Sequence, residues 1–107
     1  MGGLLSAYNL SMGEPVFLEK ARELGDRILP VFNTPSGLPL SIVNLHLRQG
    51  VEDNDNGGYV STAEASTLQL EFRYLAYLTE NDNYWEKAEK VWCLRRGQCA
   101  CLRWSIR

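Results

Sequence analysis

Apolar side chains recur at intervals of three and four residues in four stretches of the chain, and this spacing predicts four amphipathic helices. The predicted helices cover residues 1–10, 15–29, 62–78 and 84–91. Pro15 suits the first turn of a helix, where its missing N–H costs nothing, and Pro30 ends the second helix. Residues 33–60 are a long connection that contains the short apolar run Ile42-Val43. Connections of this length are typically functional or disordered.

The sequence around the first predicted turn is repeated around the last one. Leu10-Ser11-Met12-Gly13-Glu14 corresponds to Leu78-Thr79-Glu80-Asn81-Asp82, and Phe17-Leu18-Glu19-Lys20-Ala21 corresponds to Tyr84-Trp85-Glu86-Lys87-Ala88. Repeated helical hairpins are typical of a solenoid or a closed ring of helices. Because two hairpins bury little apolar surface, the repeat favours a piece of a larger protein.

The third predicted helix carries two carboxylates in line. Ser61 or Thr62 supplies a hydroxyl that can cap its N-terminus. Glu64 lies in the first turn, and Glu71, seven residues later, shares its face at about 100° per residue. The opposite face is apolar and must pack; it contains Leu68, Phe72 and Leu75. The two acids indicate either a solvated surface or one wall of a site for hydroxyl-rich ligands or a cation.

Length and charge limit the classes of protein to consider. The 107 residues suit one domain or part of one, and a net charge of −2 gives no reason to expect nucleic-acid binding. No apolar run is long enough to span a membrane, and the N-terminus lacks the basic leader of a signal peptide. Residues 1–90 contain all 13 acids against seven basic residues, whereas the remainder contains four arginines and no acid. This change in composition predicts a boundary near residue 91.

Several sequence blocks in unbroken order between residues 2 and 91 resemble glycoside hydrolase family 47, the class I α-1,2-mannosidases of N-glycan processing. They are Gly2-Gly3-Leu4-Leu5-Ser6-Ala7-Tyr8, Phe17-Leu18-Glu19-Lys20-Ala21, Gly25-Asp26-Arg27, Phe32-Asn33-Thr34-Pro35-Ser36-Gly37-Leu38-Pro39, Val43-Asn44, Ala63-Glu64 and Leu68-Gln69-Leu70-Glu71-Phe72. The resemblance implies an all-α fold, in which residues 1–91 supply two helical hairpins of an incomplete (αα)7 barrel, part of the catalytic domain. The Cys- and Arg-rich residues 92–107 depart from the family, and we expect them to be disordered or to result from a misread frame or an alternative exon.

The resemblance also implies a function for the parent protein. Members of the family hydrolyse terminal α-1,2-linked mannose from high-mannose N-glycans with inversion and require Ca²⁺. Inverting glycosidases hold two carboxyl groups about 6.5–9.5 Å apart, which leaves room for a water, and Ca²⁺ takes hard oxygen ligands. The expected partners are high-mannose glycans or glycoproteins. The expected location is the secretory pathway, in the endoplasmic reticulum or Golgi, with a membrane-anchored parent.

Residue by residue, the resemblance assigns few site positions. Glu64 corresponds to a carboxylate that lines the active-site cavity of the family. Ser41 and the loop at Pro39 correspond to a segment near the bound sugar. Glu71 corresponds to a glutamate for which we expect a supporting role in the barrel.

The family's catalytic residues are not expected within this chain. The general-acid glutamate lies upstream of the Gly2-Gly3 pair, and the base and the calcium-binding threonine lie far downstream. The fragment is therefore expected to be inactive alone and to need the missing remainder of the barrel for stability. Two alternatives stay open: a non-catalytic helical-repeat interaction module in glycoprotein quality control, and a chain that does not fold by itself.

Four further features have simpler interpretations. His46 is the only histidine and is interpreted as an ordinary loop residue, because no second metal ligand lies near it in the sequence. Cys93, Cys99 and Cys101 lack the paired spacing of a zinc site. The run from Asp53 to Glu64 matches part of a calcium-loop pattern, but its fifth position is glycine and no helix precedes it, so we interpret it as coincidence. Asn9-Leu10-Ser11 is an N-glycosylation sequon, whose use depends on a secretory route.

Overall fold

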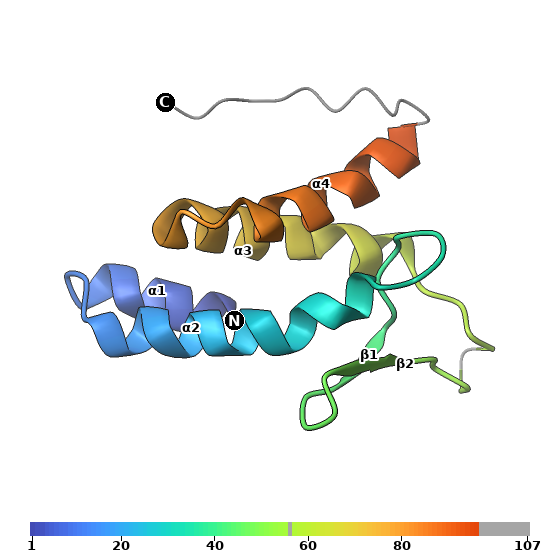
Figure 1. Ribbon diagram of the computed structural model, residues 1–107, viewed down its shortest axis with the longest axis horizontal. Coiled ribbons are helices and arrows are strands. Elements are labelled where there is room, and N and C mark those ends of the chain that lie inside the picture. Colours follow the sequence, from blue (N-terminus) through green and yellow to red (C-terminus); the bar gives the residue numbers. More distant parts are fainter. Residues whose placement is uncertain (56, 97–107) are drawn as a thin grey trace.

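Four helices arranged as two antiparallel pairs dominate the computed structural model, which describes residues 1–55 and 57–96 (Figure 1). Helix α1 pairs with α2, helix α3 pairs with α4, and the two pairs pack on each other. The helices are α1 (Gly2–Leu10), α2 (Pro15–Ile28), α3 (Thr62–Thr79) and α4 (Asp82–Arg96), and a 3₁₀ turn, η1 (Leu29–Phe32), follows α2. The predicted mostly helical fold of two hairpins is thereby confirmed.

The core lies between the two helical pairs and is centred on Phe72 of α3, which is fully buried. The Phe72 ring contacts that of Phe32 edge to face, with centroids 5.5 Å apart, and lies 5.9 Å from the ring of Tyr84. Edge-to-face contacts of this kind add to the stabilisation that burial of aromatic surface provides. The predicted apolar face of α3 is confirmed, because Phe72 and Leu75 are buried and Leu68 packs against the core.

Gly25 allows α2 to approach the second helical pair closely. A Cβ atom at this position would lie 2.6 Å from Leu75 Cδ2 and 3.4 Å from Tyr84 Cε1. Since Leu75 is itself fully buried, it has little room to move aside. Packing between the helices therefore requires glycine here, although alanine has the higher intrinsic preference for a helix.

The sequence repeat corresponds to a structural repeat. Ala21 of α2 and Ala88 of α4 occupy equivalent positions in it, and both are buried in the core. Each helical hairpin also turns through a non-glycine residue in the left-handed region, Met12 (φ 59°) in the first and Glu80 (φ 53°) in the second. The predicted pair of equivalent hairpins is therefore present in the fold.

Helix α4 continues five residues beyond the boundary expected from composition and ends at Arg96. Neither glycine nor proline interrupts the chain between Val91 and Gly97, so a helix that has already formed can continue at little cost. The remaining part of the expected tail, residues 97–107, lies outside the described residues. Within the described ranges, no helix combines the length and apolar character needed to cross a bilayer.

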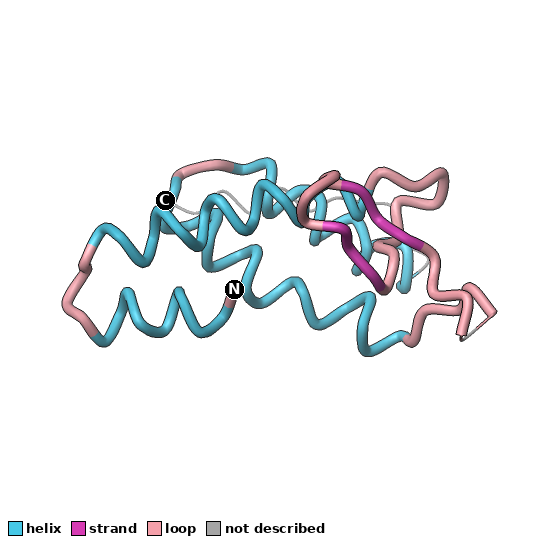
Figure 2. Tube along the Cα trace, turned by 90° about the horizontal axis from the view of Figure 1, so that it is seen from below, coloured by secondary structure: helices cyan, strands magenta, loops and turns pink. Residues whose placement is uncertain are grey.

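A small β-hairpin within the long connection was not predicted from the sequence. Strands β1 (Ile42–Asn44) and β2 (Gln49–Val51) pair antiparallel, with Ile42 opposite Val51 and Asn44 opposite Gln49 (Figure 2). The Asn44 side chain organises the turn, because its Oδ1 accepts hydrogen bonds from the backbone N–H groups of His46 and Leu47. Gly50 lies where a Cβ would be 2.7 Å from Leu40 Cδ1, so the hairpin packs closely on the preceding segment.

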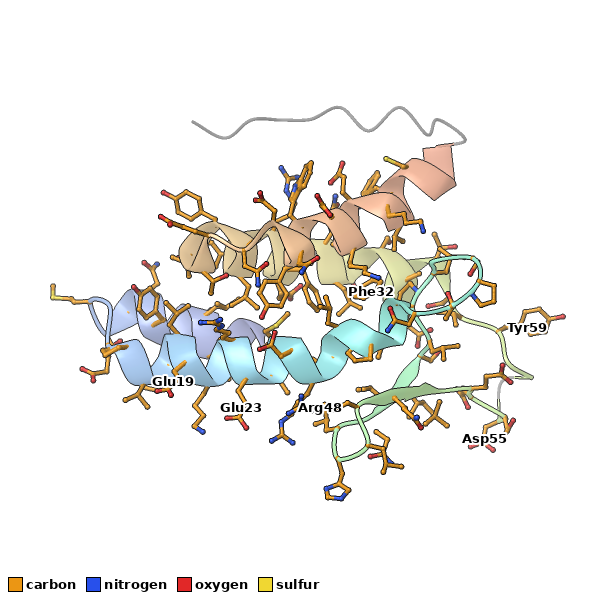
Figure 3. All side chains as sticks on the ribbon, viewed as in Figure 1. Glu19, Glu23, Phe32, Arg48, Asp55 and Tyr59 are labelled. Carbon is orange, nitrogen blue, oxygen red and sulfur yellow. The ribbon has the colours of Figure 1, made fainter. Side chains whose placement is uncertain are left out.

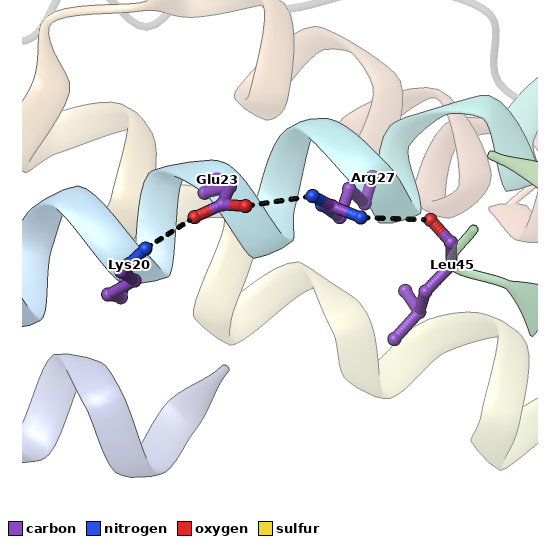
Figure 4. Close-up of polar contacts among 4 residues, drawn as sticks. All are labelled: Lys20, Glu23, Arg27 and Leu45. Atoms are coloured by element: carbon purple, nitrogen blue, oxygen red, sulfur yellow. Dashed lines mark hydrogen bonds and ion pairs between the residues drawn. The ribbon is translucent and has the colours of Figure 1, made fainter.

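A row of polar contacts connects α2 to this hairpin (Figure 4). Glu23 accepts from Lys20 at 2.8 Å and from Arg27 at 2.9 Å, and Arg27 also donates to the Leu45 carbonyl at 3.4 Å. The hydrogen bond from Lys20, followed by that from Arg27, lowers the pKa of the Glu23 carboxyl. These groups lie at the surface, so their effect is to orient the hairpin and not to stabilise the fold appreciably.

Tyr84 joins α4 to α2 through its hydroxyl group, which donates a short hydrogen bond to the Asp26 carboxylate. Burial of the ring, together with this hydrogen bond, raises the pKa of Tyr84 to about 12. The neutral phenol is therefore the form that the fold favours.

This raised pKa predicts a loss of stability in alkaline solution. An unfolded chain releases the Tyr84 proton near pH 10, whereas the folded chain holds it until about pH 12. The stabilisation is complete below pH 10 and is lost as the pH rises towards 12. Ultraviolet titration of the phenolates should show a component that ionises near pH 12, and Tyr84→Phe should remove it. A titration curve that Tyr84→Phe leaves unchanged in this range would contradict this role of Tyr84.

Candidate functional site

The first turn of α3 contains the carboxylate of greatest interest, that of Glu64. Ser61 Oγ accepts from the Glu64 backbone N–H at 3.2 Å, and Glu64 Oε2 accepts from the Ser61 N–H at 2.9 Å. These reciprocal hydrogen bonds form a capping box, which confirms Ser61 as the helix cap. The Glu64 side chain is exposed, and the cap fixes its orientation at the beginning of the helix.

A cavity of about 690 Å³ lies beside this first turn, between α3, the end of α4 and the connecting loops. Its walls combine hydroxyl groups, aliphatic side chains, one tyrosine, the Asn33 amide and the Glu52 carboxylate. They include Thr34, Ser36, Pro39, Tyr59, Thr62 and Ser66. Tyr59 lies on the loop that leads into α3, at the opposite end of the molecule from the turn between α1 and α2 (Figure 3). Hydroxyl groups and an aromatic surface suit a polar organic ligand.

The loop on one side of the cavity is fixed by its own hydroxyl groups. Thr34 Oγ1 donates to the Leu38 carbonyl at 2.7 Å, and Ser36 Oγ accepts from the Leu38 N–H at 3.2 Å. Gly37 has φ +75°, and a Cβ there would lie 3.0 Å from Cε of Lys90 on α4. The loop is therefore held against α4 in a single compact turn.

Pro39 and Ser41 lie together after this turn, but in different surroundings. Pro39 is fully buried and contributes to the cavity wall. Ser41 is half-buried and does not belong to that wall, and its Oγ is buried without a hydrogen-bond partner in the described part of the chain. A buried hydroxyl without a partner costs stability, and the burial of Ser41 Oγ keeps it from direct contact with a ligand in this arrangement.

Glu71 lies away from this cavity, in a groove along the outer face of α3. Its Oε2 is buried and lacks a hydrogen-bond partner among the described residues. Its Oε1 approaches the N-terminus of α1, since a Cβ at Gly2 would lie 3.5 Å from it. An acid beside a helix N-terminus is favourable; the supporting role expected for Glu71 stays a prediction.

The structure thus separates the predicted site residues. Pro39 lines the cavity, Glu64 lies at the exposed helix start next to it, and Glu71 contacts α1 instead. Sequence reasoning missed Thr34 and Tyr59 as wall residues. The run of Thr, Pro, Ser and Gly from residue 34 to 37 was a signal for an ordered functional turn, whereas nothing in the sequence singled out Tyr59.

The other candidate ligands stand apart. His46 is exposed at the hairpin turn, and Asp53 accepts from the Asp55 N–H within its own loop. Within residues 1–55 and 57–96, no three side chains among His, Cys, Asp and Glu come close enough to hold a metal ion. Cys93 lies half-buried on α4, and Cys99 and Cys101 lie outside the described residues.

The profile of glycosyl hydrolase family 47 matches residues 1–98 of this sequence. The chain belongs to glycosyl hydrolase family 47. The match extends past residue 91 to a region where composition had indicated a break.

Curated members of family 47 are similar to this chain over most of its length. It is 51% identical over 98 residues to the endoplasmic reticulum mannosyl-oligosaccharide 1,2-alpha-mannosidase of Saccharomyces cerevisiae, covering 86% of the chain and 18% of that protein. Proteins of the same name from Schizosaccharomyces pombe and Homo sapiens are each 47% identical, over 91 and 92 residues; each match covers 85% of the chain, and 17% and 13% of those proteins respectively. The chain therefore spans less than a fifth of the length of these relatives.

Proposed function

We propose that this chain is one segment of a mannosyl-oligosaccharide 1,2-alpha-mannosidase that removes terminal α-1,2-linked mannose from high-mannose N-glycans. The observation that carries the proposal is identity of 47–51% to three proteins of that name over at least 85% of the chain. The two helical hairpins of this chain would form part of an (αα)7 barrel. The secretory pathway is the proposed location, because these relatives are named for the endoplasmic reticulum.

Within that enzyme, Glu64 would contribute a carboxylate to the sugar-binding cavity. Its exposure and its fixed position at the start of α3 support this role. A carboxylate accepts hydrogen bonds from sugar hydroxyls, and such charge-assisted hydrogen bonds are stronger than neutral ones. The family resemblance assigns Ser41 to a segment near the bound sugar, but its hydroxyl is buried here, so it would reach the glycan only after a local rearrangement. Hydrolysis would proceed with inversion, using an acid and a base from other parts of the protein.

Calcium is the cofactor that the family resemblance implies, and the described residues do not fit a complete site for it. Ca²⁺ takes six to eight oxygen ligands, whereas no group of three potential acidic, histidine or cysteine ligands gathers in the described ranges. As the family resemblance implies, the calcium ligands of the proposed enzyme would come from other parts of the polypeptide.

The outer face of α3 is the surface on which the rest of the barrel would pack. Leu70 is 77% exposed and Tyr77 is 64% exposed, and with Tyr74 they border the groove that holds Glu71. Large apolar side chains gathered on one helix face indicate an interface. The chain spans 18% of the length of the S. cerevisiae relative, and 17% and 13% of the other two. We therefore propose that the remainder of the same polypeptide covers this face of α3 and stabilises the segment.

A chimera tests the proposed function directly. Residues 1–91 of this chain would replace the matching segment of the S. cerevisiae relative, and free mannose released from a high-mannose N-glycan would be measured. We expect the chimera to release mannose, whereas the 107-residue chain by itself should release none. A chimera that folds but is inactive, or turnover by the chain alone, would contradict the proposal.

A further inference from the structure

We propose that Asn9 is an N-glycosylation site, an inference that rests on the secretory location in the proposed function. Asn9-Leu10-Ser11 has the required hydroxyl residue two positions after asparagine and no proline between them. No other asparagine in the 107 residues is followed by serine or threonine at that spacing. Any N-linked glycan on the chain would therefore be attached at this position.

Asn9 and the residues that follow it at the end of α1 are exposed to solvent. Asn9 lies in the last turn of α1 and is exposed; Leu10 is 84% exposed and Met12, in the following turn, is 98% exposed. A glycan is bulky and hydrated, so it needs a surface position of this kind. In the part of the chain that the structure describes, the side-chain amide of Asn9 makes no hydrogen bond. A sugar attached to this side chain would therefore displace no hydrogen bond of the fold.

The location of the sequon also keeps a glycan away from the candidate site. Helix α1 ends at the turn on the left of Figure 1, whereas the segments around residues 33–40 and 58–62, which border the cavity, lie at the right. The molecule is 43 Å long in this direction. A glycan on Asn9 would project from the opposite end and leave the cavity open.

The chemistry requires a donor from the secretory pathway, an oligosaccharide linked through a diphosphate to a lipid. Nδ2 of Asn9 forms a bond to the anomeric carbon of the sugar while the bond from that carbon to the phosphate oxygen breaks. The lipid diphosphate leaves with the electron pair, and the amide nitrogen gives up one proton to the transferase. No oxidant or reductant is needed.

The test expresses the 107-residue chain behind a cleavable secretion leader in eukaryotic cells and treats it with an enzyme that removes N-linked glycans. We expect one step of increased electrophoretic mobility, and position 9 should be converted to aspartate in the peptide mass spectrum. Asn9→Gln should abolish the step. Ser11→Thr is the matched control and should retain it, because threonine also completes a sequon.

A second variant makes the negative result decisive. His46→Thr completes a sequon with Asn44-Leu45 at the exposed hairpin turn, so it reports whether the chain reaches the compartment of the transferase. If His46→Thr gains a glycan while the original sequence carries none, the proposal for Asn9 is overturned. Because the readout is a glycan and not mannose release, failure here is distinguishable from failure of the proposed hydrolase function.

Discussion

Replacing Phe72 with alanine should remove most of the stability of the packing between the two helical pairs. The side chain is fully buried and contacts Phe32 and Tyr84, which belong to different elements. Truncation of a buried phenylalanine costs about 3–5 kcal/mol, since it loses apolar burial and leaves a cavity. Hydrogen exchange of the α3 backbone amides in the isolated chain should then rise by about a hundredfold, or to the limit set by global unfolding.

Leu70→Ala is the control for this prediction because Leu70 lies two residues away on the same helix and is 77% exposed. This substitution also removes a large apolar side chain. Leu70, however, borders the face assigned to the remainder of the barrel and does not lie in the core between the two helical pairs. In the isolated chain, Leu70→Ala should change the free energy of unfolding by less than about 0.5 kcal/mol. Equal losses for Phe72→Ala and Leu70→Ala in the isolated chain would show that Phe72 is not the centre of its core.

Replacing Glu64 with glutamine in the chimera should lower kcat/KM for a high-mannose glycan by about 10- to 100-fold. This range corresponds to loss of a charged hydrogen bond worth about 1.5–3 kcal/mol. Glutamine keeps an oxygen that can accept from the Ser61 N–H, and it is an accepted residue at this capping-box position. The thermal midpoint should therefore change little, so the loss of kcat/KM would report the Glu64 carboxylate charge beside the cavity.

Ser61→Ala separates the two functions of this helix start. It removes the hydroxyl that accepts from the Glu64 N–H and should cost about 1 kcal/mol of stability, while the Glu64 carboxylate remains. Stability should fall with kcat/KM nearly unchanged. If Glu64→Gln instead lowered the thermal midpoint as much as Ser61→Ala and left kcat/KM unchanged, Glu64 would be a capping residue only.

The helices could be predicted from the sequence because their signals are long and repeated. Burial of Phe72 and Leu75 follows from the apolar spacing of α3, and the equivalence of Ala21 and Ala88 follows from the repeat. The β-hairpin could not be predicted in this way. Its strands have three residues each, too few for an alternating pattern, and its turn uses Arg48 at φ 53°, where a glycine or asparagine would have given a signal.

The candidate site was predictable only in part, because one residue type satisfies two demands. An acid at the third position of a helix is favoured by capping whether or not it also binds a ligand, so the sequence pattern of Ser61 and Glu64 cannot distinguish the two. Glu71 lies seven residues along the same helix, yet its surroundings differ because α1 packs beside it. That difference arises from tertiary contacts with Gly2, which periodicity within one helix does not contain.

The most direct test of the central claim is the initial rate of mannose release by the chimera from two glycans, one ending in α-1,2-linked mannose and one from which those residues have been trimmed. If residues 1–91 are a functional segment of a family 47 mannosidase, the chimera releases mannose from the first glycan and not from the second. A chimera that shows cooperative thermal unfolding but releases no mannose from the first glycan would contradict the claim.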